Sequence, residues 1–221
     1  MSFRKENRST LLLMIITGIL LIYTGIRYNQ SFFRLLPLFN SLFIAFLQSR
    51  ISRLAPLLGG LNCFLYAAVY FHYTLYGSAA YVFFVAGPVQ LITFFRWRKR
   101  PFKSSTMLKK MSARTRVIAG ILCVLSFFAM QAILNIFGSE YMLLDNGLTL
   151  IGILISFLTM FAYVEYTFLN VISTFMNIIL YARMMASYPE QITFLIFYVY
   201  SFLCAVKAFI YVQRLYTEQH A

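Results

Sequence analysis

The chain has few charged residues and very few acids. Only 11% of its 221 residues are charged, and Asp and Glu together number six. Soluble domains carry about 25% charged residues and about 45–50% apolar ones. Here apolar residues make up 61% of the chain. The shortage of charge therefore excludes an ordinary soluble domain and indicates an integral membrane protein.

The residue types that catalysis and metal binding need are also scarce. The two histidines lie at a segment end and near the C-terminus, and the three cysteines lie in separate apolar segments without CxxC spacing. We interpret each cysteine as a buried free thiol. The sequence has no glycine-rich phosphate loop for ATP and no pairing of a nucleophile with a base. We expect no enzyme activity, no metal and no cofactor.

Acids are rare, so the net charge is +13, but the positive residues sit between apolar segments instead of along one exposed face. This pattern argues against nucleic-acid binding. Nine of the nineteen Lys and Arg fall within residues 96–116, where there is no acid. Basic loops of membrane proteins stay in the cytoplasm, and they can contact anionic membrane lipid. We expect a multi-pass protein of the cell inner (plasma) membrane with both termini in the cytoplasm.

Eight apolar stretches are close to the length of about 17–25 residues that a membrane-spanning helix needs. Lipid offers the backbone no hydrogen-bond partners, so stretches this apolar must be helical. The first stretch resembles a secretory signal but lacks a convincing cleavage site, so we expect it to be retained. The predicted fold class is an all-α polytopic membrane helix bundle with spans at 10–26, 31–48, 54–73, 79–97, 116–137, 143–163, 167–185 and 192–213.

A weak internal repeat organises these spans. A shift of 111 residues places Ala45-Phe46-Leu47-Gln48 on Ser156-Phe157-Leu158-Thr159, and Tyr70 on Tyr181. Spans two to four then overlie spans six to eight, and span five connects them. This predicts a parallel three-helix repeat about an axis along the membrane normal, in a 1+3+1+3 arrangement. The expected units are an extra helix (1–30), the first repeat (31–98), a basic loop with a linker helix (99–138), and the second repeat with the tail (139–221).

Three spans carry polar residues at helical spacing, so that each set shares one helix face. Such groups are unlikely to face lipid, because an unpaired polar group there costs several kcal/mol. They can join helices, at about 0.6–2 kcal/mol per hydrogen bond, or line a solvated cavity. Three stripes on separate helices favour a cavity for a small polar aromatic solute. The stripes are Asn62, Tyr66, Tyr70 and Tyr73; Asp145, Thr149, Gly152 and Ser156; and Asn170, Thr174, Asn177 and Tyr181.

Other residues suggest particular roles. Pro88 predicts a kink in the fourth span, and Gln90 nearby is placed in the site. Trp97, between two arginines, is interpreted as an aromatic residue at the membrane interface. Lys207 lies deep in the last span, and we expect its long side chain to reach the inner surface with Glu165 as its partner. The acidic Asp145 of the second stripe either attracts cationic solutes or caps its helix.

From about Leu54 to Tyr216 the chain resembles the PnuC family of vitamin transporters, which share a three-one-three helix arrangement with the SWEET facilitators. The likeness rests on Leu75-Tyr76-Gly77, on Gln90 followed by Phe94-Phe95-Arg96-Trp97, and on Asp145, Thr149 and Tyr181 in register. The resemblance implies facilitated diffusion (uniport) of nicotinamide riboside by alternating access. It also implies a cytoplasmic kinase that traps the solute, a link to NAD biosynthesis, and association into homo-oligomers.

The chain departs from the riboside transporters at three positions. Phe157 stands where these transporters usually have a tryptophan, and Asn170 replaces another tryptophan. Thr174 stands at a position that we associate with Asn or Asp in the family. Another B vitamin or nucleoside (thiamine, riboflavin or a deoxynucleoside) therefore stays open as the solute. A substrate-binding subunit of a larger importer, or a purely structural bundle, is also open. The predicted substrate-binding residues are Asn62, Tyr66, Gln90, Asp145, Thr149, Phe157, Thr174, Asn177 and Tyr181.

Overall fold

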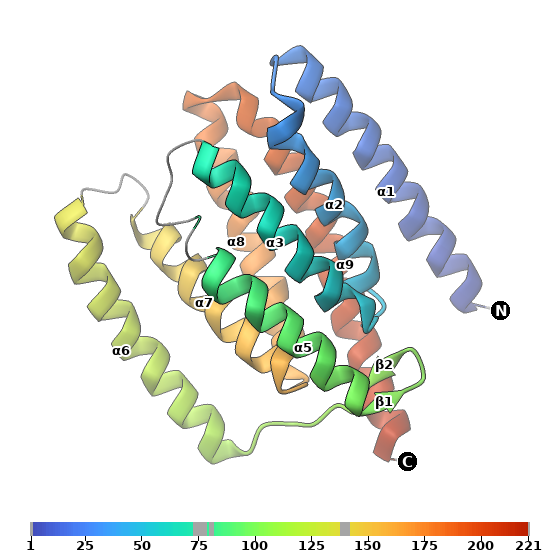
Figure 1. The fold of residues 1–221 in the computed structure, drawn as a ribbon. Coiled ribbons are helices and arrows are strands. Elements are labelled where there is room, and N and C mark those ends of the chain that lie inside the picture. Colours follow the sequence, from blue (N-terminus) through green and yellow to red (C-terminus); the bar gives the residue numbers. More distant parts are fainter. Residues whose placement is uncertain (1, 73–78, 80–81, 138–141, 221) are drawn as a thin grey trace.

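The computed structural model describes all residues except 1, 73–78, 80–81, 138–141 and 221. Its long helices run alternately up and down, and both termini lie at the same end of the bundle (Figure 1). This end also carries most of the basic residues, and we call it the basic end. The all-α helix bundle predicted from the sequence is confirmed. The long helices are α1 (Ser2–Arg27), α2 (Phe32–Gln48), α3 (Leu54–His72), α5 (Gly87–Lys99), α6 (Ala113–Phe137), α7 (Met142–Met160), α8 (Glu165–Ser187) and α9 (Ile192–His220).

The fourth predicted span is interrupted near its proline. A π-helical turn, η1 (Val82–Ala86), precedes α5, and Pro88 lies in the first turn of α5. Proline is tolerated there, because the first amides of a helix have no intrahelical acceptor. The expected irregularity is therefore present, as a π turn followed by a restarted helix. A short 3-10 turn, η2 (Pro189–Gln191), similarly leads into α9.

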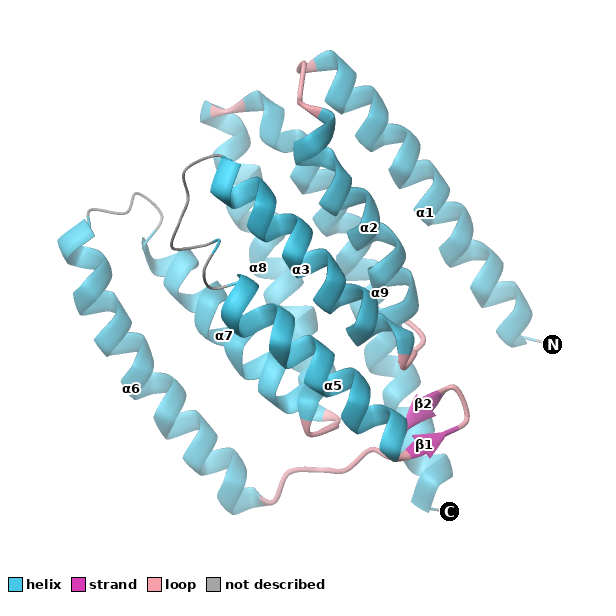
Figure 2. Cartoon of the chain, in the orientation of Figure 1, coloured by secondary structure: helices cyan, strands magenta, loops and turns pink. Residues whose placement is uncertain are grey.

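The basic loop after α5 folds into a small hairpin at the basic end (Figure 2). Strand β1 (Pro101–Phe102) pairs antiparallel with β2 (Ser105–Thr106). The Gln219 side chain near the end of α9 holds the chain at the end of β2 through two hydrogen bonds. Its Nε2 donates to the Thr106 carbonyl oxygen (3.0 Å), and its Oε1 accepts from the Leu108 amide (2.8 Å). The ion pair between Lys103 and Glu218 adds a third link.

Six helices form a closed ring. Contacts run from α2 to α3, α5, α7, α8 and α9, and then back to α2. The first three ring helices and the last three meet at two seams, α2 with α9 and α5 with α7. This order of contacts supports the predicted parallel repeat, which stays a prediction. Helix α1 packs outside the α2/α9 seam, and α6 stands at the edge of the bundle against α7 (Figure 1).

Two buried clusters hold the ring together. One lies toward the basic end and joins Trp97 of α5, Leu158 of α7, Tyr166 of α8 and Val212 of α9. The other joins Leu21 of α1 to α2 and α9, and so closes the α2/α9 seam from outside; its further members include Leu38, Leu42, Tyr200 and Cys204. Both clusters link the two groups of three helices.

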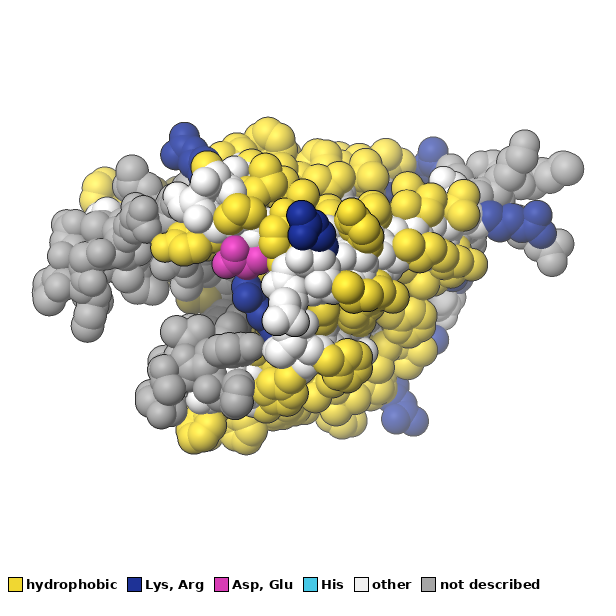
Figure 3. Space-filling view, turned by 90° about the horizontal axis from the view of Figure 1, so that it is seen from above, with side chains coloured by type: hydrophobic (Ala, Val, Ile, Leu, Met, Phe, Trp, Pro, Cys, Tyr) yellow, Lys and Arg dark blue, Asp and Glu magenta, His cyan; other side chains and the backbone are white. Residues whose placement is uncertain are grey.

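The outer surface of the bundle is apolar. Large hydrophobic side chains face outward along α1 and α6, and Ile26 reaches 77% exposure. Yellow hydrophobic side chains also surround the end opposite the basic end (Figure 3). A surface this apolar marks contact with lipid or protein instead of water. Among the described residues, Arg8–Arg27, Glu165–Ser187 and Pro189–His220 are long and apolar enough to cross a membrane, and Phe32–Gln48, Leu54–Val69 and Asn146–Met160 are shorter apolar helices.

Candidate functional site

A small cavity with a mixed polar and apolar lining lies inside the ring. Its volume is about 60 Å³, and residues from all six ring helices line it. The polar lining residues are Gln48, Gln90, Ser156, Thr159 and Asn170, the aromatic ones are Trp97 and Tyr166, and Pro56 and Ala208 complete the wall from α3 and α9. Both groups of three helices therefore contribute polar groups to one hollow.

Gln90 is the predicted site residue that lines this cavity directly. Its side chain lies against Gly59 of α3, where an added Cβ would stand 3.3 Å from Gln90 Oε1. At the neighbouring Gly60 an added Cβ would come within 2.9 Å of the Leu91 side chain. Small residues let membrane helices approach closely. The two adjacent glycines thus bring α5 close to α3 and fix where Gln90 points; the sequence analysis did not assign them this role.

Two members of the polar stripes reach the cavity without having been assigned to the site. Ser156 of α7 and Asn170 of α8 both line it. The Ser156 hydroxyl also donates to the Gly152 carbonyl oxygen of its own helix (2.9 Å). Their helical spacing within the stripes was the feature of the sequence that could have assigned them to the site. The spacing does not show which end of a stripe meets the neighbouring helices, so the residues nearer the basic end were missed.

Trp97 is buried, with 3% of its surface exposed, so its prediction as an interfacial aromatic is wrong. Its indole Nε1 donates to the Thr159 carbonyl oxygen (2.8 Å), and its ring lies 6.4 Å from the Tyr166 ring. Trp97 also lines a second hollow of about 420 Å³ at the basic end. It therefore stands between the central cavity and that hollow, whose cationic lining residues are Arg96, Lys99, Arg100 and Lys109.

The stripe on α3 faces α2. Asn62 is buried, and its Nδ2 donates to the Pro37 carbonyl oxygen and to Ser41 Oγ, both at 2.9 Å. The Tyr66 hydroxyl lies 3.3 Å from the same Ser41 oxygen. These bonds join α2 to α3, as the helix-joining interpretation of a stripe expects. One acceptor, Asn62 Oδ1, is buried without a hydrogen-bond partner among the described residues.

The stripe on α8 bonds mainly within its own helix. The Thr174 hydroxyl donates to the Asn170 carbonyl oxygen (2.8 Å), and Asn177 Nδ2 donates to the Ser173 carbonyl oxygen (2.9 Å). The Tyr181 ring stacks on two rings of α9, with centroids 5.3 Å and 5.0 Å away; these belong to Phe194 and Tyr198. In this arrangement Tyr181 joins α8 to α9, and its ring stacks on protein side chains instead of on a solute.

The remaining predicted residues lie on α7. Thr149 is half-buried, and it is not among the residues that line the central cavity. Phe157 is 45% exposed and points away from the cavity that its neighbour Ser156 lines. Consecutive helical residues are about 100° apart around the axis, and on α7 the lining is formed by Ile155, Ser156 and Thr159, whose side of the helix does not include Phe157. Asp145 belongs to α7, but its side chain lies outside the described part of the structure.

The predicted pairing of Glu165 with Lys207 is wrong. Glu165 Oε1 accepts from Arg116 Nη2 (2.8 Å) and from the Met111 amide (3.1 Å), so it anchors the loop before α6. Lys207 Nζ donates to the Thr10 hydroxyl of α1 (2.6 Å). The two side chains leave their helices on different sides of the bundle. Sequence spacing within single helices could not reveal this.

Comparisons with known proteins agree with this architecture. The sequence model of the nicotinamide mononucleotide transporter family matches residues 31–213, which run from the start of α2 almost to the end of α9. The chain is similar to the crystal structure of the vitamin B3 transporter PnuC, with a TM-score of 0.77 and 20% identity over 95% of this chain and 91% of that one. No curated protein sequence matches it. Since the family match covers the whole six-helix ring, the chain belongs to the nicotinamide mononucleotide transporter family, whose members are membrane transporters and not enzymes.

Proposed function

We propose that the protein carries nicotinamide riboside across the plasma membrane by uniport, through alternating exposure of one central site. The observation that supports this most is the central cavity, to which both groups of three helices contribute polar side chains. A nicotinamide carboxamide and a ribose each offer donors and acceptors. Gln90 and Asn170 supply side-chain amides that can pair with both kinds of group, and Trp97 and Tyr166 supply aromatic faces.

The size of the cavity supports a site that opens and closes. At about 60 Å³ it is far smaller than the roughly 300–1,000 Å³ of ordinary ligand pockets. A riboside therefore enters only when the two groups of helices separate. The seam between α5 and α7, held by Trp97 and Thr159, is the place for that separation toward the basic end. We infer that the structure represents a contracted state of the transport cycle.

The other predicted residues belong to the wider site of the expanded state. Asn62 keeps a buried acceptor, Oδ1, that lacks a partner among the described residues, and a solute hydroxyl or amide can donate to it. Tyr66 is hydrogen-bonded beside it. Along α7 and α8, rotation of the helices would turn further polar and aromatic groups toward the solute. These are Asp145, Thr149, Phe157, Thr174, Asn177 and Tyr181.

The lining of the central cavity supports uniport. Among the described side chains, no carboxylate lines the central cavity, and proton or sodium relays through membranes generally use buried acids. The solute then moves down its own gradient. We propose that a cytoplasmic kinase keeps that gradient steep by phosphorylating the incoming solute, and that copies of the chain associate into homo-oligomers.

Flux through the purified protein in liposomes tests the proposal. Radiolabelled nicotinamide riboside should enter without any partner protein, at a rate that ionophores against the proton gradient and membrane potential leave unchanged. Loss of flux with the ionophores would refute uniport. Absence of any flux by the purified chain would favour a subunit of a larger importer.

Competition in the same liposomes identifies the solute. Unlabelled nicotinamide mononucleotide, thiamine, riboflavin and a deoxynucleoside should compete less than unlabelled riboside does. Stronger competition by one of them would assign the transporter to that solute. Such a result would be explained by Phe157, Thr174 and Asn170, the positions at which the sequence departs from the riboside transporters.

A further inference from the structure

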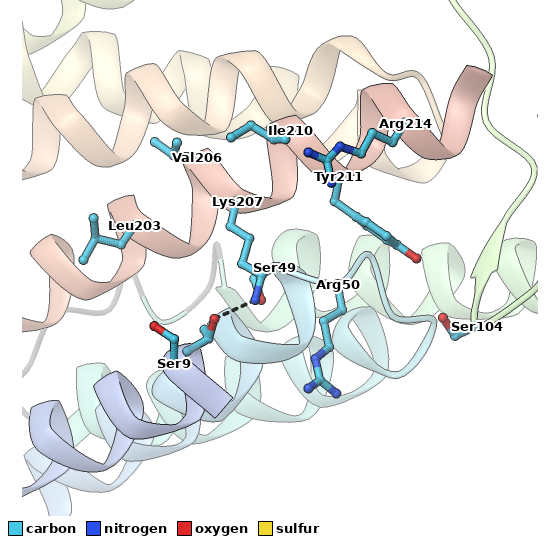
Figure 4. Close-up of a pocket in the computed structure, with 11 residues that line it drawn as sticks. Ser9, Ser49, Arg50, Ser104, Leu203, Val206, Lys207, Ile210, Tyr211 and Arg214 are labelled. Atoms are coloured by element: carbon cyan, nitrogen blue, oxygen red, sulfur yellow. Dashed lines mark hydrogen bonds between the residues drawn. The ribbon is translucent and has the colours of Figure 1, made fainter. Parts of the chain in front are cut away.

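A further hollow lies outside the ring, at the basic end (Figure 4). It has a volume of about 600 Å³ and lies between α1, α2 and α9. Farther from the basic end, α1 packs closely on the α2/α9 seam through Leu21 and through the hydrogen bond from Thr193 to Thr24 (3.0 Å). Near its N-terminus, Lys207 bridges to Thr10 instead. The crevice is the space beside this bridge.

One half of the crevice is cationic. Arg50, Lys207 and Arg214 line it, and no carboxylate is among its described lining residues. Figure 4 shows Lys207 extending from α9 toward α1, with Arg50 beside it. The Arg50 guanidinium lies 4.3 Å from the centroid of the Phe46 ring, and its Nε is buried without a hydrogen-bond partner among the described residues. The hydroxyl groups of Ser9 and Thr10 add further donors.

This arrangement suits a phosphate group. Arginine and lysine bind phosphate oxygens through charge-assisted hydrogen bonds, and several donors converging on one space can satisfy several oxygens at once. The rule that basic residues stay in the cytoplasm explains why the charges lie at this end. It does not explain why three of them line one hollow.

The other half of the crevice is apolar. Leu203, Val206 and Ile210 follow each other at helical spacing along α9 and line the same hollow as the cations. Leu203 and Ile210 are each nearly half exposed. A free phosphate ion or a soluble nucleotide leaves this apolar wall uncovered. A phospholipid covers it with an acyl chain while its headgroup stays with the cations.

We propose that this crevice binds one anionic phospholipid. Its phosphate lies between Arg50, Lys207 and Arg214, and one acyl chain follows the row from Ile210 to Leu203 toward the membrane interior. The site is separate from the central cavity and does not depend on which solute is carried. It also gives α1 a role, since the lipid would fill the space that α1 leaves beside α9.

Lipid titration of the full chain, followed by native mass spectrometry in a neutral detergent, tests the proposal. Phosphatidylglycerol should bind more tightly than phosphatidylcholine of the same chain length. Each cation near a membrane surface contributes to binding of anionic lipid by an amount that corresponds to about fivefold in affinity. Arg50→Gln and Arg214→Gln should therefore each weaken phosphatidylglycerol about fivefold, and the double variant about 25-fold. Arg98→Gln is the matched control, because Arg98 is exposed at the same end but does not line the crevice.

A second variant tests the apolar half. Ile210→Gln should weaken long-chain phosphatidylglycerol and leave a short-chain, water-soluble phosphatidylglycerol unaffected. Inorganic phosphate is added as a third ligand to separate a lipid site from a free-anion site. The proposal would be overturned by equal binding of phosphatidylglycerol and phosphatidylcholine, or by equal losses of affinity in the Arg50 and Arg98 variants. It would also be overturned if inorganic phosphate bound as tightly as phosphatidylglycerol. Arg214 is exposed, so its variant folds even if the Arg50 variant is unstable.

Discussion

The indole Nε1 of Trp97 on α5 donates a 2.8 Å hydrogen bond to the carbonyl oxygen of Thr159 on α7. The last carbonyl groups of a helix lack intrahelical partners, and Thr159 is the second-last residue of α7. The Thr159 carbonyl oxygen also accepts from the Ala162 amide (3.0 Å), so the Trp97 indole uses the second lone pair of this oxygen. The bond joins the two groups of three helices between the central cavity and the hollow at the basic end.

Substitutions at Trp97 should separate the hydrogen bond from the packing. Trp97→Phe keeps an aromatic ring but removes the N–H donor, and should lower the free energy of unfolding by about 1 kcal/mol. Trp97→Ala also leaves a cavity, and should lower it by about 3–5 kcal/mol. Unfolding followed by circular dichroism in detergent measures both. No loss in Trp97→Phe would show that the hydrogen bond contributes nothing, and equal losses in the two variants would show that the ring packing adds nothing to it.

The same residue should control access to the cavity. Ser156→Cys, in a background without the three native cysteines, places one thiol in the cavity wall. A polar thiol reagent supplied to the basic end should label it slowly when Trp97 is present and much faster in Trp97→Ala. A labelling rate of this introduced thiol that does not respond to the change at position 97 would contradict the role of Trp97 as a barrier.

The cavity and the α2–α3 contact should respond differently to substitution. Gln90→Leu should weaken solute binding about 2- to 13-fold, the value of one lost hydrogen bond of about 0.5–1.5 kcal/mol, with little change in stability. Asn62→Leu should also lower stability by about 1–2 kcal/mol, because it removes two bonds to α2. Ser41→Ala is the control for Asn62, since it disturbs the same contact away from the cavity. Isothermal titration and thermal unfolding of the three variants measure these effects, and normal binding by Gln90→Leu would remove Gln90 from the site.

The sequence predicted the fold well for a physical reason. Apolar runs bounded by basic residues, proline and glycine indicate where the spans lie, and each predicted span coincides with a helix of the structure. The ends are less well predicted, since α1 begins at Ser2 instead of residue 10 and α9 continues to His220 instead of residue 213. The site was harder, because spacing tells which residues share a face but not which helix they meet. Asn62 and Tyr66 share a face that meets α2, and Ser156 reaches the cavity while Phe157 faces outward. Trp97 was misjudged because its arginine neighbours suggest an interface, although the helix turns the indole inward.

Tyr181 should contribute to stability through its ring. It stacks on Phe194 and Tyr198 of α9, and an aromatic pair is worth about 0.5–1.5 kcal/mol beyond its buried area. Tyr181→Ala should therefore lower the free energy of unfolding by at least about 1–3 kcal/mol, while Tyr181→Phe, which keeps the stack, should change it much less. Thermal unfolding compares the two. A large loss in Tyr181→Phe would instead assign the stabilisation to the hydroxyl group.

Gln219 should determine the order of the hairpin between α5 and α6. Its side chain bonds both the Thr106 carbonyl oxygen and the Leu108 amide, so Gln219→Ala removes two links between α9 and the loop. Hydrogen exchange at residues 105–109 should become faster in this variant, and the amide of Leu108 should respond most, because its acceptor is lost. Gln213→Ala, an exposed position on the same helix, is the control and should leave exchange there unchanged. Unchanged hydrogen exchange in Gln219→Ala would contradict this role. The ion pair between Lys103 and Glu218 would then be sufficient to hold the hairpin against α9.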